Sequence, residues 1–309
     1  MKGTFINRTH ISGWLYEHDL RERKTGENSK HPGTDFISGT ISIATDDDMT
    51  NVIPVHFTYV TATTARGNAN ATYNLLKQII DGKLQTVMDT DKDTAAKLRV
   101  DSAIGLNEFY SDRAGKEELV SVKRNEGGFV HTTNNLEDEE KLRNTFECDI
   151  VITNVRTVDA NEEKNLPEKA ILKGAIFNFR KELLPIELSA INPQAIAYFE
   201  SLGASAKTPV FTRVKGHQVS ETVVRKITEE SAFGEPSVRE VTSSRKDWVV
   251  TWAQGEPYIR DDESTITAKE LTEAMANREI ALADIKKRHD DYKASNDHKS
   301  TPAKGVFNF

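Results

Sequence analysis

The sequence is nearly devoid of cysteine, with Cys148 alone among 309 residues. A single cysteine excludes an intrachain disulfide and any zinc site built on cysteine ligands. Cys148 lies inside the apolar, strand-like run FECDIVITNV. We therefore expect its thiol to act as a small buried hydrophobe rather than as a reactive group.

Long hydrophobic runs are also absent, and none approaches the roughly 18–20 residues that a membrane-spanning helix needs. The first residues, MKGTFINRTHISG, contain no apolar signal core, so we expect a cytoplasmic protein with no membrane partner. Hydrophobic residues make up 37% of the chain and charged residues 29%, which is typical of a soluble globular protein. The length fits two domains of ordinary size.

Catalytic and cofactor-binding patterns are missing as well. The chain has no Walker phosphate loop, no GxSxG elbow and no HExxH metal motif. Residues 89–100 begin like a calcium loop but have Thr94 in place of glycine and Val100 in place of glutamate. The acidic run 46–48 fits a metal ligand set or a solvated turn, and the turn is the favoured interpretation. We expect a protein without cofactor or metal that is not an enzyme.

What the sequence does contain is a repeated pattern. Two pairs of β-rich runs, residues 36–60 and 170–188, share a glycine followed by a proline: Gly39 and Pro54 in the first copy, Gly174 and Pro185 in the second. A helix-like stretch and two more strand-like runs follow each pair. Apolar and polar residues alternate in these runs, as in half-buried strands. The predicted strands are 9–23, 36–45, 51–60, 97–110 and 118–133, then 146–159, 170–179, 182–188, 209–227 and 236–252, with helices at 70–80 and 192–202.

Three strands, a helix and two strands is the element order of the oligonucleotide/oligosaccharide-binding (OB) fold, a five-stranded barrel. We therefore predict a mainly β protein with two tandem OB-fold-like barrels, a C-terminal helix and a flexible tail. The predicted boundaries are 1–133 for the first barrel, 134–145 for a charged connector, 146–258 for the second barrel, 259–295 for the helix and 296–309 for the tail.

The C-terminal helix has its own start signal. Thr267 and Glu270 are spaced as a capping box. An apolar stripe at helical spacing follows, formed by Leu271, Met275, Leu282 and Ile285. We expect this stripe to pack on one of the domains or on another subunit, which leaves a homo-oligomer open.

The net charge of −7 argues against nucleic acid only if charge is spread evenly. Here the acids cluster in loops, whereas lysine and arginine fall in or beside the predicted strands. Aromatic residues are interleaved with these cations, and bases can stack on outward-facing aromatic rings. If Ile11 and Leu15 point into the first barrel, Trp14 and Tyr16 point outward. The predicted nucleic-acid-binding residues are Trp14, Tyr16, Arg21, Arg23, Lys24, His56, Lys123, Arg124, Lys173, Phe177, Phe179, Arg180, Lys181, Arg213, Lys215, Arg245, Lys246 and Trp248.

A second interpretation of the same aromatics stays open. Outward rings also pack against a helix, the other domain or a partner subunit. The assignment of faces depends on strand register, and a slip of one residue inverts every face.

The last residues, GVFNF, fit either a frayed terminus or a docking peptide anchored by Phe307 and Phe309. The docking interpretation resembles the single-stranded DNA-binding proteins of bacteria and phages, whose mobile tails end in an aromatic residue and recruit replication partners. Those tails are strongly acidic, whereas this one mixes acids with lysines.

The chain as a whole resembles tandem OB-fold single-stranded DNA-binding proteins of the kind that phages encode for replication or recombination. The resemblance implies non-catalytic, largely sequence-independent binding of single-stranded DNA by base stacking and charge neutralisation. The alternative is a structural or assembly protein, such as a virion component, whose β-domains make protein–protein contacts. That alternative accounts more easily for the negative net charge and the last helix.

Overall fold

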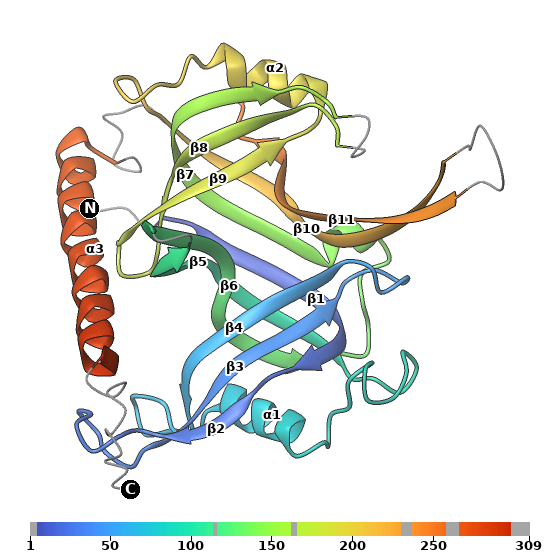
Figure 1. The fold of residues 1–309 in the computed structure, drawn as a ribbon, viewed down its shortest axis with the longest axis vertical. Helices are drawn as coiled ribbons and strands as arrows, with labels where there is room; N and C mark the ends of the chain where they lie inside the picture. The colour runs from blue at the N-terminus through green and yellow to red at the C-terminus, as the bar shows by residue number, and fades with distance from the viewer. Residues whose placement is uncertain (1–4, 114–115, 162–165, 230–236, 258–265, 298–309) are drawn as a thin grey trace, which may run out of the picture.

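The computed structural model describes residues 5–113, 116–161, 166–229, 237–257 and 266–297 (Figure 1). Within these ranges the protein is mainly β, with one long C-terminal helix beside the sheet. The first half contains β1 (Asn7–His18), β2 (Arg21–Lys24), β3 (Asp35–Ala44), β4 (Val52–Thr61), α1 (Ala71–Ile80), β5 (Lys97–Arg113) and β6 (Lys116–Thr132). A 3₁₀ turn, Glu140–Leu142, precedes β7 (Asn144–Val158), β8 (Lys169–Phe177), β9 (Leu183–Ala190), α2 (Pro193–Ser201), β10 (Val210–Glu229), β11 (Ser237–Ala253) and α3 (Ala268–Asp297).

All described strands belong to one mixed sheet of eleven strands, not to two separate barrels as the sequence predicted. The reason is a direct pairing between the halves. The start of β1 runs antiparallel to the start of β7, from Asn7 opposite Cys148 to Ile11 opposite Asn144. The sheet therefore continues across the boundary, although the chain itself crosses it only through residues 134–145.

Within this sheet, the pairings of each half close into a ring of five strands. The first ring runs β1–β3–β4–β6–β5 and returns to β1, with β4 and β6 parallel. The second ring runs β7–β8–β9–β11–β10 and returns to β7, with β9 and β11 parallel. Helices α1 and α2 occupy the same place in the two rings, between the third and fourth strands. The predicted internal repeat is therefore a repeat of topology.

The glycine of each repeated pair stands where the second strand of a ring lies close to another stretch of backbone. A Cβ on Gly174 would lie 2.3 Å from the carbonyl oxygen of Val151, and one on Gly39 would lie 2.8 Å from the backbone of Asp19 and Leu20. Gly39 also has φ +134°, a conformation that side chains rarely adopt. The same contact explains why predicted strand 9–23 is in fact two strands, β1 and β2, interrupted at Asp19 and Leu20.

Each ring encloses its own apolar core. In the first ring, Ile11, Leu15 and Ile41 are fully buried with Leu76 and Ile79 of α1. The second core includes Cys148, which is fully buried as predicted, and burial raises the pKa of its thiol. Both ring helices begin at an asparagine cap, with Asn70 accepting from the Thr72 amide at 3.1 Å and Asn192 from the Gln194 amide at 2.8 Å. Among the described helices, none is long and apolar enough to cross a membrane.

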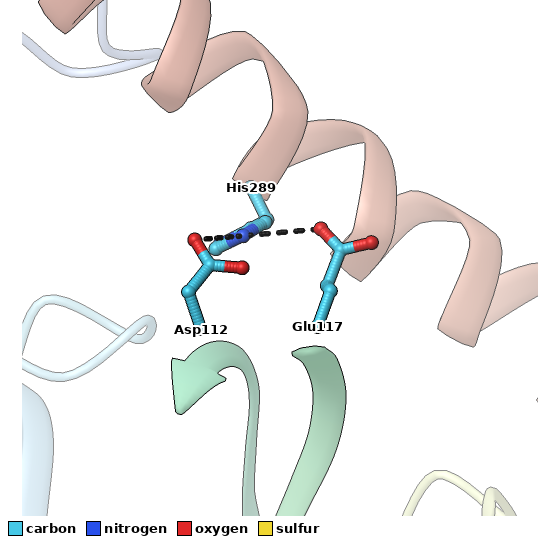
Figure 2. A group of neighbouring side chains, drawn as sticks. All are labelled: Asp112, Glu117 and His289. Atoms are coloured by element: carbon cyan, nitrogen blue, oxygen red, sulfur yellow. Dashed lines mark ion pairs between the residues drawn. The ribbon is translucent and has the colours of Figure 1, made fainter. Parts of the chain in front are cut away.

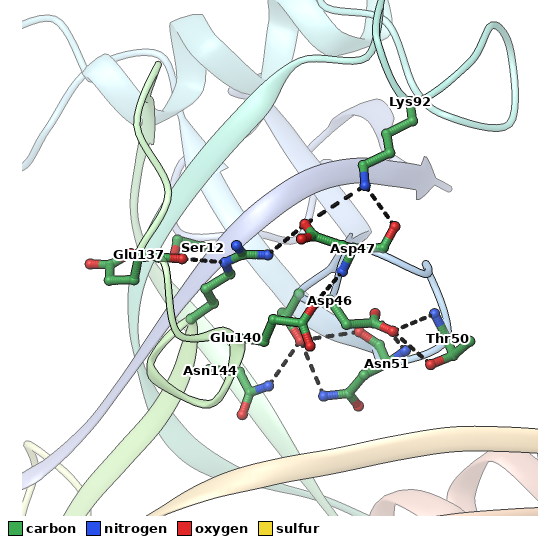
Figure 3. Close-up of polar contacts among 11 residues, drawn as sticks. Ser12, Asp46, Asp47, Thr50, Asn51, Lys92, Glu137, Glu140 and Asn144 are labelled. Carbon is green, nitrogen blue, oxygen red and sulfur yellow. Dashed lines mark hydrogen bonds and ion pairs between the residues drawn. The ribbon is translucent and has the colours of Figure 1, made fainter.

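Polar contacts hold the two halves at a fixed junction, which Figure 3 shows around the acidic turn 46–48. Asp46 accepts hydrogen bonds from Thr50 and Asn51; these outweigh the opposing effect of burial and lower its pKa. Asp47 accepts from the buried Arg143 at 3.0 Å, and this hydrogen bond lowers the pKa of Asp47. Asn144 donates to the Thr45 hydroxyl at 2.9 Å. The acidic run is thus a turn that fastens the connector to the first ring.

The predicted capping box opens α3, because Glu270 accepts from the Thr267 amide at 3.0 Å and the Glu270 amide donates to the Thr267 hydroxyl at 3.2 Å. The predicted apolar stripe is wrong at one position. Met275 is 56% exposed, whereas Ala274 is buried. The covered face of α3 runs through Leu271, Ala274 and Arg278, and its contact with β5 is ionic. Arg278 pairs with Glu108, at 2.6 Å for one of its two hydrogen bonds.

Candidate nucleic-acid interface

The outer surface of β2, β3 and β4 carries aromatic and cationic side chains on a regular strand scaffold. Inward positions of these strands, such as Ile37, Ile41 and Phe57, are completely buried. Because successive side chains alternate between faces, Phe36, Thr40 and His56 point outward. The register shift between Phe57 and Val60 turns Tyr59 outward as well. We call this surface the open strand face and define it as Arg21, Arg23, Phe36, Thr40, His56 and Tyr59.

The aromatic centre of this face is a pair of rings from neighbouring strands. The centroids of Phe36 and Tyr59 are 4.7 Å apart with an interplanar angle of 45°. Tyr59 is half exposed, at 50%. A tilted pair at the surface leaves ring area uncovered, and uncovered aromatic area is what a stacking base requires.

Two arginines accompany this pair. Arg23 lies directly opposite Phe36 in the β2–β3 register, and Arg21 lies opposite Ser38. Directly opposite residues in an antiparallel pair share a face, so both guanidinium groups lie on the aromatic side. Both arginines are exposed, and neither has an ion-pair partner among the described residues. Lys24, by contrast, lies 3.4 Å from Asp35.

His56 completes the face as a polar, uncharged group. It is half-buried, and its Nδ1 lies 3.3 Å from the Thr40 hydroxyl. Burial, with a further contribution from the Arg124 charge, lowers the pKa of His56 below its ordinary value. At neutral pH the imidazole therefore offers hydrogen bonds but no charge to a phosphate.

The corresponding outer face of the second ring is covered. Val151, Ala175 and Phe177 point outward from β7 and β8, yet all three are buried against residues that precede and follow the ring. The Phe177 ring lies 4.9 Å from the ring of Phe5. The covering residues from the C-terminal segment are Ile266, Leu271 and Ala274.

The β5–β6 hairpin of the first ring covers the next part of that face. Leu106 packs against the second core, and Lys123 donates a hydrogen bond to the carbonyl oxygen of Glu187 on β9. Burial lowers the pKa of Lys123 to about 8. An opening of only about 300 Å³ remains between the hairpin and Lys173, Pro185 and Glu187.

Three predicted stacking residues are buried, so their predicted outward exposure is wrong. Phe177 is 1% exposed because the segments around α3 cover it. Trp248 is 8% exposed because it points into the second core, where its ring lies 5.4 Å from that of Phe146. Trp14 is 6% exposed beneath three cations, with the Lys92 ammonium 4.5 Å from its ring centroid. The second interpretation, packing, holds for these three rings.

The other predicted residues are spread over several places. Tyr16 is half-buried. Arg124 and Arg213 are ion-paired, at 2.8 Å to Glu126 and 2.7 Å to Asp149, and the Arg245 guanidinium lies 3.9 Å from Asp247. Lys173 and Lys246 are exposed on the second ring.

Phe179 is 88% exposed beside Arg180 and Lys181, at the rim of a cavity of about 540 Å³ next to α3. Phe307 and Phe309 lie outside the described residues.

Among the aromatics that the sequence did not predict as binding residues, Tyr59, Phe129 and Trp252 are exposed and Phe36 is half-buried at the surface. The signal for Phe36 was present, since Ile37, Ile41 and Ile43 alternate inward and place it outward. Tyr59 was obscured because the pairing of β3 with β4 shifts at a bulge between Ile37 and Gly39. Nothing in the local pattern separates the buried Trp248 from the half-exposed Trp252.

One group of side chains has the composition of a metal site (Figure 2). Asp112, Glu117 and His289 place one potential ligand atom each within 4.8 Å of one another. However, Lys293 lies 2.8 Å from Asp112, and Lys286 lies 2.6 Å from Glu117. These lysines already neutralise both carboxylates and lower their pKa values. The group is better suited to fastening α3 to the tip of the β5–β6 hairpin than to holding a cation.

Comparisons with known proteins give one family. A family model described as YorF matches residues 6–288. No curated protein matches the chain. Among solved structures, the crystal structure of the wild-type single-stranded DNA-binding protein from Thermus aquaticus is similar over 84% of this chain and 96% of that one. The identity is 12% and the TM-score is 0.43, so this similarity carries no argument about function.

Proposed function

The chain belongs to the YorF family, and we propose that it binds single-stranded DNA on the open strand face of its first ring. The observation that carries the proposal is the surface pair of half-buried Phe36 and half-exposed Tyr59, beside two arginines that have no ion-pair partner among the described residues. Accessible aromatic rings next to cations without an ion-pair partner fit the two chemical features that every DNA strand repeats, a base and a phosphate.

The two parts of the face would contribute different interactions. Stacking of a base on an aromatic ring is worth roughly 1–3 kcal/mol and is tolerant of sequence, because every base has a π-face. Arg21 and Arg23 would neutralise phosphates and release counterions, which makes binding sensitive to salt. Thr40 and His56 offer neutral hydrogen-bonding groups between these elements.

The β5–β6 hairpin supplies a wall for the bound strand in this proposal. Its Glu108 contacts Arg278 of α3, so the neighbouring Phe109 points away from that helix. Phe109 is 42% exposed, and Val122, which shares its face, is 49% exposed. Apolar side chains at this position would shield stacked bases from water.

Each ring would be an OB-fold barrel, which is suggested by its five strands, its parallel closing pair and its helix between strands three and four. The protein would catalyse no reaction and would act in DNA replication or recombination.

An electrophoretic shift with labelled oligo-dT at two salt concentrations tests the proposal. We expect binding in the micromolar range or tighter at low salt, weakening steeply as salt rises. The absence of a shift at low salt would rule out the DNA-binding function and favour the alternative of an assembly protein.

A further inference from the structure

A second surface with aromatic and cationic character lies where the two rings meet. It is a groove of about 850 Å³ whose walls come from β1, β5 and β6 of the first ring and from β7, β10 and β11 of the second. The contacts of the acidic turn and of Arg143 fix the two rings relative to each other, so the groove has a defined shape.

Each ring contributes one exposed aromatic side chain to this groove. Phe129 of β6 is 70% exposed, and Trp252 of β11 is 46% exposed. The two residues lie on equivalent strands, the last of each ring. Phe129 belongs to neither core cluster of the rings. Large rings that are left uncovered in a groove provide the platform on which bases stack.

The charges beside these rings favour an anion. The Lys215 ammonium lies 4.9 Å from the centroid of the Trp252 ring. Arg8 and Lys215 both approach Glu147, at 2.9 Å and 3.8 Å, and Glu147 is buried. Two cations thus share the Glu147 carboxylate, and the Arg8 side chain is 70% exposed to solvent. Asp101, the other carboxylate of the groove lining, is paired with Arg99 at 3.2 Å. One positive charge remains available for a phosphate.

We propose that the junction groove is a second binding site for the same DNA strand, with bases stacked on Phe129 and Trp252 and a phosphate at Arg8 and Lys215. This inference rests on the proposed function, because the groove would extend a strand first held by the open strand face. Occupation of both sites by one strand raises affinity through effective concentration. A short oligonucleotide would fill only one site, whereas a longer one would bridge both.

Tryptophan fluorescence gives a direct readout of this groove. The chain contains three tryptophans, and Trp14 and Trp248 are buried. Quenching by oligo-dT would therefore report contact with Trp252. The variant Trp252→Phe retains an aromatic surface, so we expect its affinity to stay within about threefold while the quench disappears.

The decisive experiment measures affinity as a function of oligo-dT length for the double variant Phe129→Ala/Trp252→Ala. We expect a loss of at least about tenfold for long oligonucleotides, with little change for the shortest one that binds. Tyr292→Ala is the matched control, because it removes a 69% exposed ring on α3 and should change neither affinity. The thermal midpoint of each variant shows that the fold is intact.

The outcomes separate the two proposals. Wild-type binding without tryptophan quenching, and with an unchanged double variant, would overturn the groove and leave the open strand face standing. If the wild-type protein binds no oligonucleotide of any length, both proposals fail. If the double variant does not fold, the Trp252→Phe fluorescence result alone decides whether the groove is occupied.

Discussion

The two rings share a topology, but the outer strand face of the first ring is accessible to solvent and that of the second ring is covered. In the first ring, Phe36 and Tyr59 are accessible to solvent beside two arginines that have no ion-pair partner among the described residues. In the second ring, Phe177 occupies an outward position but is buried under Phe5 and the segment that leads into α3. An outward aromatic therefore has no fixed role in this fold. What the rest of the chain places over it decides whether it stabilises the protein or remains available to a ligand.

The largest expected effect comes from truncating the covered ring. Phe177→Ala should lower the free energy of unfolding by about 3–5 kcal/mol, because it leaves a cavity in a well-packed cluster. Phe36→Ala should cost only about 1 kcal/mol and instead weaken oligo-dT binding. Chemical denaturation and fluorescence anisotropy measure the two quantities. Equal destabilisation by both substitutions would contradict the distinction between the faces.

The ion pair between Arg278 and Glu108 holds α3 beside the covered face of the second ring. Arg278 and Glu108 are both largely buried, with side-chain exposures of 14% and 7%. Arg278→Ala would leave Glu108 buried without its partner and should cost about 3 kcal/mol. Lys293→Ala, at a more exposed pair with Asp112, should cost about 1 kcal/mol or less. Urea denaturation of both variants checks this order, and a reversed order would show that α3 is not held by this pair.

A smaller effect is expected from the charges of the open face. Arg21→Ala/Arg23→Ala should weaken binding of oligo-dT about tenfold, and should reduce the slope of log affinity against log salt by about 1.4, or about 0.7 per lost phosphate contact. Lys287→Ala/Arg288→Ala removes the same charge from exposed positions of α3 and serves as the control. If Lys287→Ala/Arg288→Ala weakens binding as much as Arg21→Ala/Arg23→Ala, net charge rather than the open strand face governs the affinity for DNA.

The sequence alone predicted the element order well, because the alternation of apolar and polar residues along a strand is a local signal. The junction could not be predicted, because Asn7 pairs with Cys148 across most of the first half of the chain. The predicted exposure of the aromatic site residues was wrong for a related reason. Inward and outward positions follow from the local pattern, but the burial of Trp14 under Lys92 and Arg143, and of Phe177 under Phe5, depends on distant segments.

The domain boundaries and most of the site residues remain predictions. Arg21, Arg23 and His56 are the predicted residues that the fold brings together with aromatic rings on the open strand face. Their aromatic partners there are not Trp14 and Tyr16, as the sequence suggested, but Phe36 and Tyr59. The sequence thus predicted the cations of this face, whereas its aromatic residues were identified only from the three-dimensional structure.

The central claim is that one ring face binds DNA and the other does not. Hydrogen–deuterium exchange of the full chain, with and without saturating oligo-dT, tests it most directly. The account predicts slower exchange in β2, β3 and β4, and unchanged exchange in β8 and β9. Protection confined to β8 and β9, or no protection in β2 to β4 under conditions where binding is demonstrated, would contradict it.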